Sequence, residues 1–291
     1  MPLSLLFHLE PLSTVPEAFL GREAQTWFLR QVEALDPALS QELHDGANRK
    51  PYTVSDVMRA QKGGFLLRIT AFDDRLEDFV LGRLIPALPD RLRLWWADFR
   101  ILRVLDTSSG NPLAARVGWA DLAQAGELEK TRSVLLNFFS PTAFRSQGAD
   151  IPLPLPALLF RGWLEKWNEC APAERCIDPR FLDFAELAVQ VDALQNLNTH
   201  RVEFANGKRG GATGFQGAVG ISVLPRKSCA AWAEDAHKPW AADWVSRWEA
   251  YRREALALAL FSFFCGTGHH TAAGLGQTHP VLSGGQGRNG Q

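Results

Sequence analysis

The residues of this 291-residue chain that could most directly do chemistry lie in a short loop near its N-terminus. His44 stands at the end of a predicted helix and is followed by a glycine and by the adjacent cations Arg49 and Lys50. An imidazole titrates near neutral pH, so it can take a proton from a ribose 2′-hydroxyl or return one to a leaving 5′ oxygen. A neighbouring cation can stabilise the charge that grows on phosphorus. The loop therefore fits phosphodiester cleavage without a metal, and the alternative is that His44 caps the helix beside a solvated turn.

A glycine-rich run near the C-terminus, residues 266–276, indicates anion binding. Four of its eleven residues are glycine, and it follows an apolar segment of helical spacing at 244–264. Glycine permits positive φ and lets backbone N–H groups approach a phosphate. The glycines follow a helix, whereas those of dinucleotide and P-loop motifs follow a strand, so these readings are disfavoured. The plain alternative is a helix cap with a tight turn. The candidate RNA contacts in this run are Gly266, Gly268, His269, His270, Gly274 and Gly276, and we favour contact over catalysis for the two histidines.

A second glycine cluster, residues 206–217, lies in a predicted hairpin and carries Lys208 and Arg209. Between residues 200 and 227 there are five lysines or arginines, including Arg201, and one acid. Release of counterions from phosphates favours RNA on such a surface. Arg201, Lys208 and Arg209 are therefore candidate RNA-binding residues.

The composition limits the other functions. Lysine and arginine number 31 and aspartate and glutamate 32, so any nucleic-acid contact must be a confined patch. The four cysteines show neither paired C-x-x-C spacing nor a histidine partner motif, so we predict no zinc site, no disulfide scaffold and no cofactor. No uncharged apolar run is long enough for a membrane span, and we expect a cytoplasmic protein.

The order of predicted elements repeats once along the chain. Strands at 3–10, 64–72 and 91–105 alternate with helices at 18–34, 37–43 and 76–84; strands at 133–139, 199–204, 217–224 and 275–281 then alternate with helices at 157–169, 181–187 and 244–264. This order predicts an α+β protein with two tandem ferredoxin-like domains. We place the first at residues 1–125, the second at 126–282 and a disordered tail at 283–291.

The tryptophans and the arginines of residues 91–103 remain open to two interpretations. Trp95 and Trp96 are adjacent on a predicted strand and should face opposite sides, so one could be exposed for base stacking. Arg91 and Arg93 share a face, which suits either an RNA-facing sheet or an ordinary solvated surface.

Taken together, His44 with Lys50, the strand at 133–139, the glycine-containing hairpin and the terminal glycine-rich run resemble the CRISPR repeat-processing endoribonucleases of the RAMP superfamily. The resemblance spans nearly the whole chain. It implies tandem ferredoxin-like domains with a C-terminal glycine-rich loop and metal-independent cleavage of CRISPR repeat RNA by the 2′-hydroxyl. The implied products carry a 2′,3′-cyclic phosphate and a 5′-hydroxyl, and the mature guide RNA stays bound. The resemblance leaves open whether the protein joins other CRISPR effector subunits or forms a homodimer.

Carried over by position, the family's catalytic histidine falls on His44 and its supporting lysine on Lys50. The tyrosine that some members place fifteen residues before the histidine is Leu29 here, and Arg30, Tyr52 or Ser55 could replace it. The missing phenol keeps open a non-catalytic RNA-binding RAMP subunit. A small-molecule phosphate or nucleotide enzyme is the alternative from another class.

Overall fold

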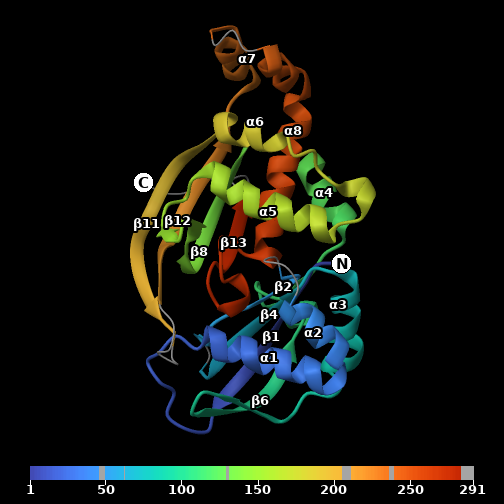
Figure 1. Cartoon of the computed structure of the whole chain (residues 1–291), viewed down its shortest axis with the longest axis vertical. Coiled ribbons are helices and arrows are strands. Elements are labelled where there is room, and N and C mark those ends of the chain that lie inside the picture. The colour runs from blue at the N-terminus through green and yellow to red at the C-terminus, as the bar shows by residue number, and fades with distance from the viewer. Residues whose placement is uncertain (46–49, 62, 129–130, 205–210, 236–238, 283–291) are drawn as a thin grey trace.

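The computed structural model describes the chain except for residues 46–49, 62, 129–130, 205–210, 236–238 and 283–291. The predicted sites Arg49, Lys208 and Arg209 and the predicted tail lie outside the described residues. Figure 1 shows two domains of mixed helix and strand stacked along the long axis, with the N-terminal domain in blue to cyan. Among the described residues, the helices are too short or too polar to cross a membrane.

The N-terminal domain is an antiparallel sheet covered by helices. Its elements are β1 (Leu3–Pro11), α1 (Gly21–Leu35), α2 (Pro37–Asp45), β2 (Tyr52–Val54), β3 (Met58–Arg59), β4 (Phe65–Ala71), α3 (Asp74–Phe79), the π turn η1 (Val80–Leu84), β5 (Arg91–Leu94), β6 (Ala97–Leu105), η2 (Thr107–Ser109) and β7 (Ala115–Arg116). The sheet order is β2-β4-β1-β6-β5. The four main strands are, in chain order, β1, β2, β4 and β6. They have the ferredoxin-like order, because the first strand, β1, lies between the third, β4, and the fourth, β6.

The C-terminal domain repeats that order. Its elements are α4 (Trp119–Leu128), β8 (Ser133–Thr142), β9 (Phe144–Ser146), β10 (Ala149–Ile151), α5 (Pro156–Cys170), η3 (Ala173–Arg175), α6 (Phe181–Ala188), β11 (Val189–Glu203), β12 (Gly211–Val223), α7 (Arg226–Asp235), α8 (Pro239–Cys265), η4 (Thr271–Ala273) and β13 (Thr278–Leu282). The sheet order is β11-β12-β8-β13. The predicted fold class, two tandem ferredoxin-like domains, is confirmed.

Local sequence explains the main elements. Buried and half-buried residues alternate along the first part of β8, as expected for a strand with one face on the core. The side chain of Asp73 accepts a hydrogen bond of 3.0 Å from the Leu76 backbone N–H and caps α3. The cap is therefore Asp73, three residues before the predicted start of this helix at residue 76.

The packing of α4 bears on the domain limit. Trp119, its first residue, lies 5.1 Å from Trp167 and 5.3 Å from Phe261 between ring centroids, both in the C-terminal core. The last strand of the N-terminal sheet ends at Arg116. Packing thus assigns α4 to the C-terminal domain, whereas the predicted limit at residue 125 would divide this helix.

Two other predictions differ in detail from the structure. Trp95 and Trp96 form the turn between β5 and β6 rather than a strand, and both are exposed, by 43% and 42%. Trp95 has φ of +56°, a conformation of turns and not of strands. The hairpin strand β11 begins at Val189, ten residues before the predicted start, because its exposed edge position leaves little apolar alternation to recognise.

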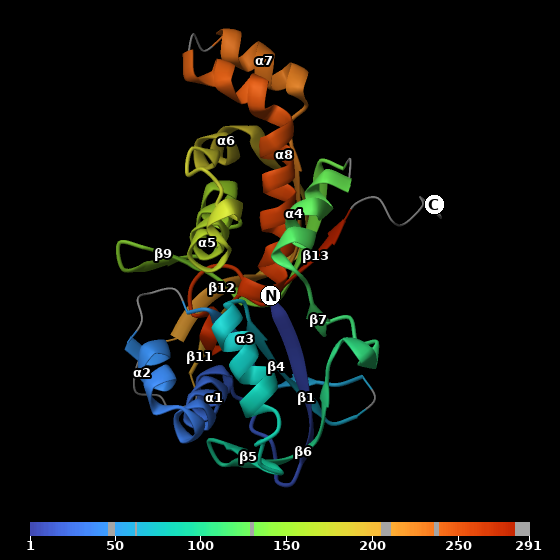
Figure 2. The same cartoon turned by 90° about the vertical axis from the view of Figure 1, so that its right-hand side faces the viewer.

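The junction between the domains is polar and hydrogen-bonded. Arg68 on β4 is fully buried and donates to the Phe263 carbonyl at 2.7 Å, to Gln277 Oε1 at 3.1 Å and to Ser4 Oγ at 2.8 Å. Thr70 on the same strand donates to the Phe264 carbonyl at 2.7 Å. These bonds satisfy carbonyls at the end of α8, which have no partner within the helix. They fix the start of the glycine-rich run against the N-terminal sheet, where α8 reaches the junction in Figures 1 and 2.

Candidate RNA-cleaving site

A cleft of about 1170 Å³ lies between the two domains. It is lined by residues of α1, α2, α5, β9 and the glycine-rich run. Five predicted site residues line it together: His44, Lys50, Gly268, His269 and His270. Residues more than 200 positions apart in the sequence thus meet in one cleft.

His44 lies in the last turn of α2, with its side chain exposed at the cleft. Lys50 Nζ donates to the His44 carbonyl at 2.7 Å and also to the Leu43 carbonyl. A lysine at this place satisfies orphan carbonyls and complements the helix dipole. Lys50 therefore caps the helix and fixes the backbone that carries the imidazole, while His44 lies in the last turn of the same helix.

Helix α1 contributes two cleft residues that sequence reasoning missed, Arg22 and Gln25. They stand three apart and so share one face of the helix. The Arg22 guanidinium carbon lies 3.8 Å from the centre of the Phe204 ring, a cation–π contact that leaves the N–H edge of the guanidinium available. The pattern of two polar residues at this spacing beside a buried face was the signal that could have found them.

The three residues considered as replacements for the missing tyrosine are not placed for that role. Tyr52 is fully buried, and burial raises the pKa of its phenol to about 12. Ser55 is 1% exposed and donates to the Asp56 carbonyl at 2.7 Å. Arg30 is exposed but is not among the described residues that line the cleft. Leu29, at the tyrosine position, packs on the N-terminal core.

The glycine-rich run begins with a helix cap. Gly266 has φ of +63°, directly after the last residue of α8, and its N–H donates to the Ser262 carbonyl at 2.9 Å. This is the left-handed residue that commonly follows a helix. Gly266 is buried and lies outside the cleft lining, so its conformation serves the turn.

The other three glycines are required by close packing of the run. A Cβ on Gly268 would lie 2.2 Å from the Ala143 carbonyl oxygen, one on Gly274 2.8 Å from Phe19, and one on Gly276 1.9 Å from the Thr267 oxygen. All three have positive φ. Only Gly268 lines the cleft. The packing thus accounts for glycine here without a ligand, although Gly268 still borders the cleft.

His269 and His270 face the cleft from this run. His269 Nε2 lies 3.3 Å from Asp150 Oδ1, and Asp150 is held by Arg145 at 2.9 Å and by the Thr213 N–H at 3.0 Å. Burial lowers the pKa of His269, while the Asp150 charge opposes this shift. Burial and the neighbouring His269 lower the pKa of His270 to about 4, so this imidazole is neutral at pH 7. His269 Nε2 meets no hydrogen-bond criterion among the described residues, so its close approach to Asp150 becomes an ion pair only when the imidazole is protonated.

Cations dominate the described lining of the cleft. They are Arg22, Lys50, Arg145, Arg161 and Lys166, against one acid, Glu165. Lys166 is buried and donates to the Cys265 carbonyl at 2.6 Å and to Thr271 Oγ1 at 3.0 Å. It therefore ties α5 to the end of α8 and to the glycine-rich run. The cleft can accept an anion, and the imidazoles of His44, His269 and His270 stand beside these cations.

Arg201 lies elsewhere. Its exposed side chain borders a separate hollow of about 330 Å³, and among the described residues none lines both this hollow and the cleft. The sequence could not place Arg201 at this hollow, because which pocket a β11 side chain borders depends on how the two domains pack.

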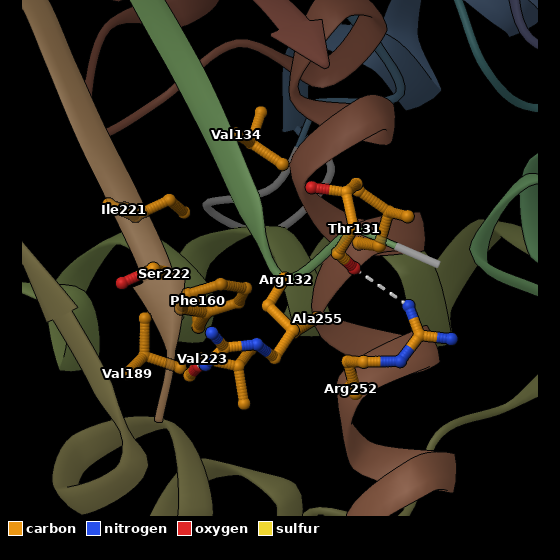
Figure 3. A pocket seen from close by; sticks show the side chains of 11 residues that line it. Thr131, Arg132, Val134, Phe160, Val189, Ile221, Ser222, Val223, Arg252 and Ala255 are labelled. Atoms are coloured by element: carbon orange, nitrogen blue, oxygen red, sulfur yellow. Dashed lines mark hydrogen bonds between the residues drawn. The ribbon is translucent and has the colours of Figure 1, made fainter. Parts of the chain in front are cut away.

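A third pocket, drawn in Figure 3, lies inside the C-terminal domain between β8, β12 and α8. Its volume of about 10 Å³ is at the lower limit of what one water requires. Arg252 closes it by donating to the Thr131 carbonyl at 2.9 Å, the dashed line in Figure 3. It is a packing space and not a ligand site.

Comparison with known proteins decides the family. Residues 1–67 match the family model of the CRISPR Cas6 N-terminal domain, and residues 136–278 match that of the CRISPR-associated endoribonuclease Cas6. The chain belongs to the Cas6 endoribonuclease family. The resemblance seen in the sequence is thereby confirmed. No curated protein sequence matches this chain.

Solved Cas6 structures share the whole fold. The Thermus thermophilus Cas6 is 26% identical with a TM-score of 0.68, covering 97% of this chain and 98% of its own. A Cas6 product complex is 29% identical with a TM-score of 0.77, covering 97% of this chain and 99% of that one. A Cas6-related protein from Pyrococcus furiosus, 12% identical with a TM-score of 0.61 over 97% of this chain and 100% of its own, shares the fold alone.

Proposed function

We propose that this Cas6 chain cleaves CRISPR repeat RNA in the cleft between its domains. The observation that carries the proposal is that His44, Lys50 and His269 line one cationic cleft. A Cas6 of 29% identity has been solved in complex with its product, which supports an RNA substrate for this fold. A local cluster of cations in one cleft also agrees with a formal charge of −1 for the whole chain.

In the proposed reaction, the ribose 2′ oxygen attacks the adjacent phosphorus while the bond from phosphorus to the 5′ oxygen breaks. One proton leaves the 2′-hydroxyl and one reaches the 5′ oxygen, so the products are a 2′,3′-cyclic phosphate and a 5′-hydroxyl. His44 carries one of these proton transfers, because its exposed imidazole reaches the cleft. No metal takes part in this scheme.

Two cations support His44 in different ways. Lys50 holds the end of α2 through the Leu43 and His44 carbonyls, so it positions the imidazole. Arg22 projects from α1 with its guanidinium stacked on Phe204 and stabilises the charge that develops on the phosphate. Arg22 thus supports the reaction from α1, the helix on which some family members carry a tyrosine.

The remaining RNA contacts extend from the same cleft. Gly268, His269 and His270 contact the backbone of the RNA, with Arg145 and Arg161 beside them. Arg49, Lys208, Arg209 and Arg201 are proposed as further contacts from the sequence. Gly266, Gly274 and Gly276 act by shaping the run. We also propose that the guide RNA stays bound after cleavage, since the same cations hold the product phosphate. Association with other CRISPR effector subunits and formation of a homodimer stay predictions.

The test compares two RNAs in EDTA: the repeat of the CRISPR array encoded beside the protein, and the same RNA with a deoxyribose at the scissile position. We expect cleavage of the first only, with a cyclic phosphate on the upstream product. His44→Ala should abolish cleavage and leave RNA affinity intact, while the matched control His8→Ala, on β1 outside the cleft, should cleave normally. Cleavage of the deoxy substrate, or a loss of affinity in His44→Ala equal to its loss of activity, would contradict the proposed chemistry.

A non-catalytic RNA-binding subunit is the second candidate, favoured by the burial of Tyr52 and by Leu29 at the tyrosine position. It predicts salt-sensitive repeat binding with no cleavage of either RNA.

A further inference from the structure

The second hollow, on which Arg201 borders, has the features of a binding site. Its volume of about 330 Å³ is at the lower end of the range for small-ligand pockets. Both domains form it: Phe19 and residues 55–58 come from one, and residues 139–141, 200–202, Gln216 and Gln277 from the other. This size suits one nucleotide and excludes a duplex.

Gln277, which lines this hollow, carries a buried hydrogen-bond donor that has no partner among the described residues. Its side chain is 1% exposed, and its Oε1 accepts a hydrogen bond of 3.1 Å from Arg68. An arginine only donates, so this contact fixes which end of the amide is oxygen. The Nε2 group then has no acceptor among the described residues. A buried donor without a partner costs free energy, which a bound acceptor would recover.

Gln216 supplies the complementary group. Its Nε2 donates to the Phe139 carbonyl at 3.0 Å, which orients the amide and leaves Oε1 to accept. Gln277, with an unpartnered donor, and Gln216, with an acceptor, thus line the same hollow. The edges of nucleobases present donors and acceptors side by side, and proteins read unpaired bases at these edges.

The walls and the rim fit the rest of a nucleotide. Phe19 and Phe139 are half-buried aromatic side chains that line the hollow, and bases stack on such rings. His200 and Arg201 are exposed at the rim on β11. Arg201 lies 3.9 Å from Glu203, a weak surface ion pair that a phosphate can replace.

We infer that this hollow binds one unpaired nucleobase of the RNA that is cleaved in the main cleft, with Gln277 and Gln216 reading the base edge and Arg201 contacting its phosphate. The inference rests on the proposed function for the presence of RNA. It gives Arg201 a role outside the cleavage cleft and adds a specificity determinant on the other side of the glycine-rich run.

The key variant is Gln277→Glu. It retains an oxygen for Arg68 and so preserves the buried contact, but it replaces the free donor with an acceptor. We expect about a tenfold loss of affinity for repeat RNA, the size of one well-placed hydrogen bond to a base. Gln195→Glu is the matched control, because it adds the same charge on exposed β11 outside the hollow. It should change affinity less than twofold.

A double-mutant cycle identifies the base. Each unpaired nucleotide of the repeat is made abasic in turn, and its binding to the wild-type and Gln277→Glu proteins is measured. At one position the tenfold effect of the substitution should vanish, because the base that Gln277 reads is absent. An equal loss on every abasic RNA, or no loss on the intact RNA, would overturn the inference.

Two further readouts separate the possible failures. If the wild-type protein binds and cleaves repeat RNA but shows no coupled position, the inference alone fails. If the wild-type protein neither binds nor cleaves, both it and the proposed function fail. In another outcome, a nucleoside monophosphate stabilises the wild-type protein, but not Gln277→Glu, against thermal unfolding, while the substitution leaves RNA affinity unchanged. That result would assign the hollow to a free nucleotide and overturn the inference that it binds a base of the RNA.

Discussion

Gly268 tests whether the glycines of the terminal run serve packing or ligand approach. Its φ is +79°, and a Cβ there would lie 2.2 Å from the Ala143 carbonyl oxygen, against 3.4–4 Å for an ordinary contact. The His269 N–H donates to this same oxygen at 2.9 Å. In Gly268→Ala the run must therefore shift by about 1 Å relative to β8, with loss of this hydrogen bond.

Gly110 is the matched control. It has φ of +67°, and a Cβ would meet nothing within 4 Å. Gly110→Ala should lower the free energy of unfolding only through the left-handed conformation, by about 1 kcal/mol. This loss is partly offset because alanine restricts the unfolded chain. Gly268→Ala should lose the same contribution and roughly 1–3 kcal/mol more from overpacking, so its free energy of unfolding should fall by about 2–4 kcal/mol in total.

Thermal unfolding with parallel RNA-binding measurements distinguishes the two roles. At about 2–4 °C per kcal/mol for a chain of this size, Gly110→Ala should lower the Tm by roughly 2–4 °C and Gly268→Ala by about 4–16 °C. Repeat-RNA cleavage should fall in Gly268→Ala only, because His269 moves with the run. If both variants unfold at the same temperature while Gly268→Ala alone loses RNA affinity, the packing argument is wrong and Gly268 serves the approach of the phosphate.

Three further substitutions probe the cleft. Arg22→Ala should reduce single-turnover cleavage about 100-fold, the range for loss of one transition-state contact, with less than a fivefold change in RNA affinity. The control Arg30→Ala, on the same helix, should behave as wild type. Equal effects of the two substitutions would show that Arg22 takes no part in the chemistry. Asp150→Asn should lower the pKa of His269 further, because the carboxylate opposes the effect of burial, and an NMR titration that shows no change would indicate that the ion pair does not form in solution. Burial lowers the pKa of Lys166 below its ordinary 10.5, so just below that pH the unfolded chain binds more protons than the folded protein and the free energy of unfolding rises with pH. Lys166→Met should lack this rise. Identical slopes of unfolding free energy against alkaline pH in the two proteins would refute the prediction.

Much of the fold was predictable because its signals are local. Apolar periodicity located β1, α5 and the C-terminal part of α8, and the order of these elements was enough to predict two ferredoxin-like domains. Edge positions and turns were harder. Strand β11 has few buried residues, and the turn at Trp95 and Trp96 reads as strand from its residue types alone.

For the candidate site, the sequence determined which residue types were present and that His44 would end a helix. Only the tertiary structure decided which of them meet. It brought His44, Arg22 and His269 to one cleft and sent Arg201 to another hollow, because these placements depend on how the two domains dock through Arg68. It also showed that the glycines pack against backbone atoms of distant segments. Such contacts are set by long-range geometry, which no local pattern of residues encodes.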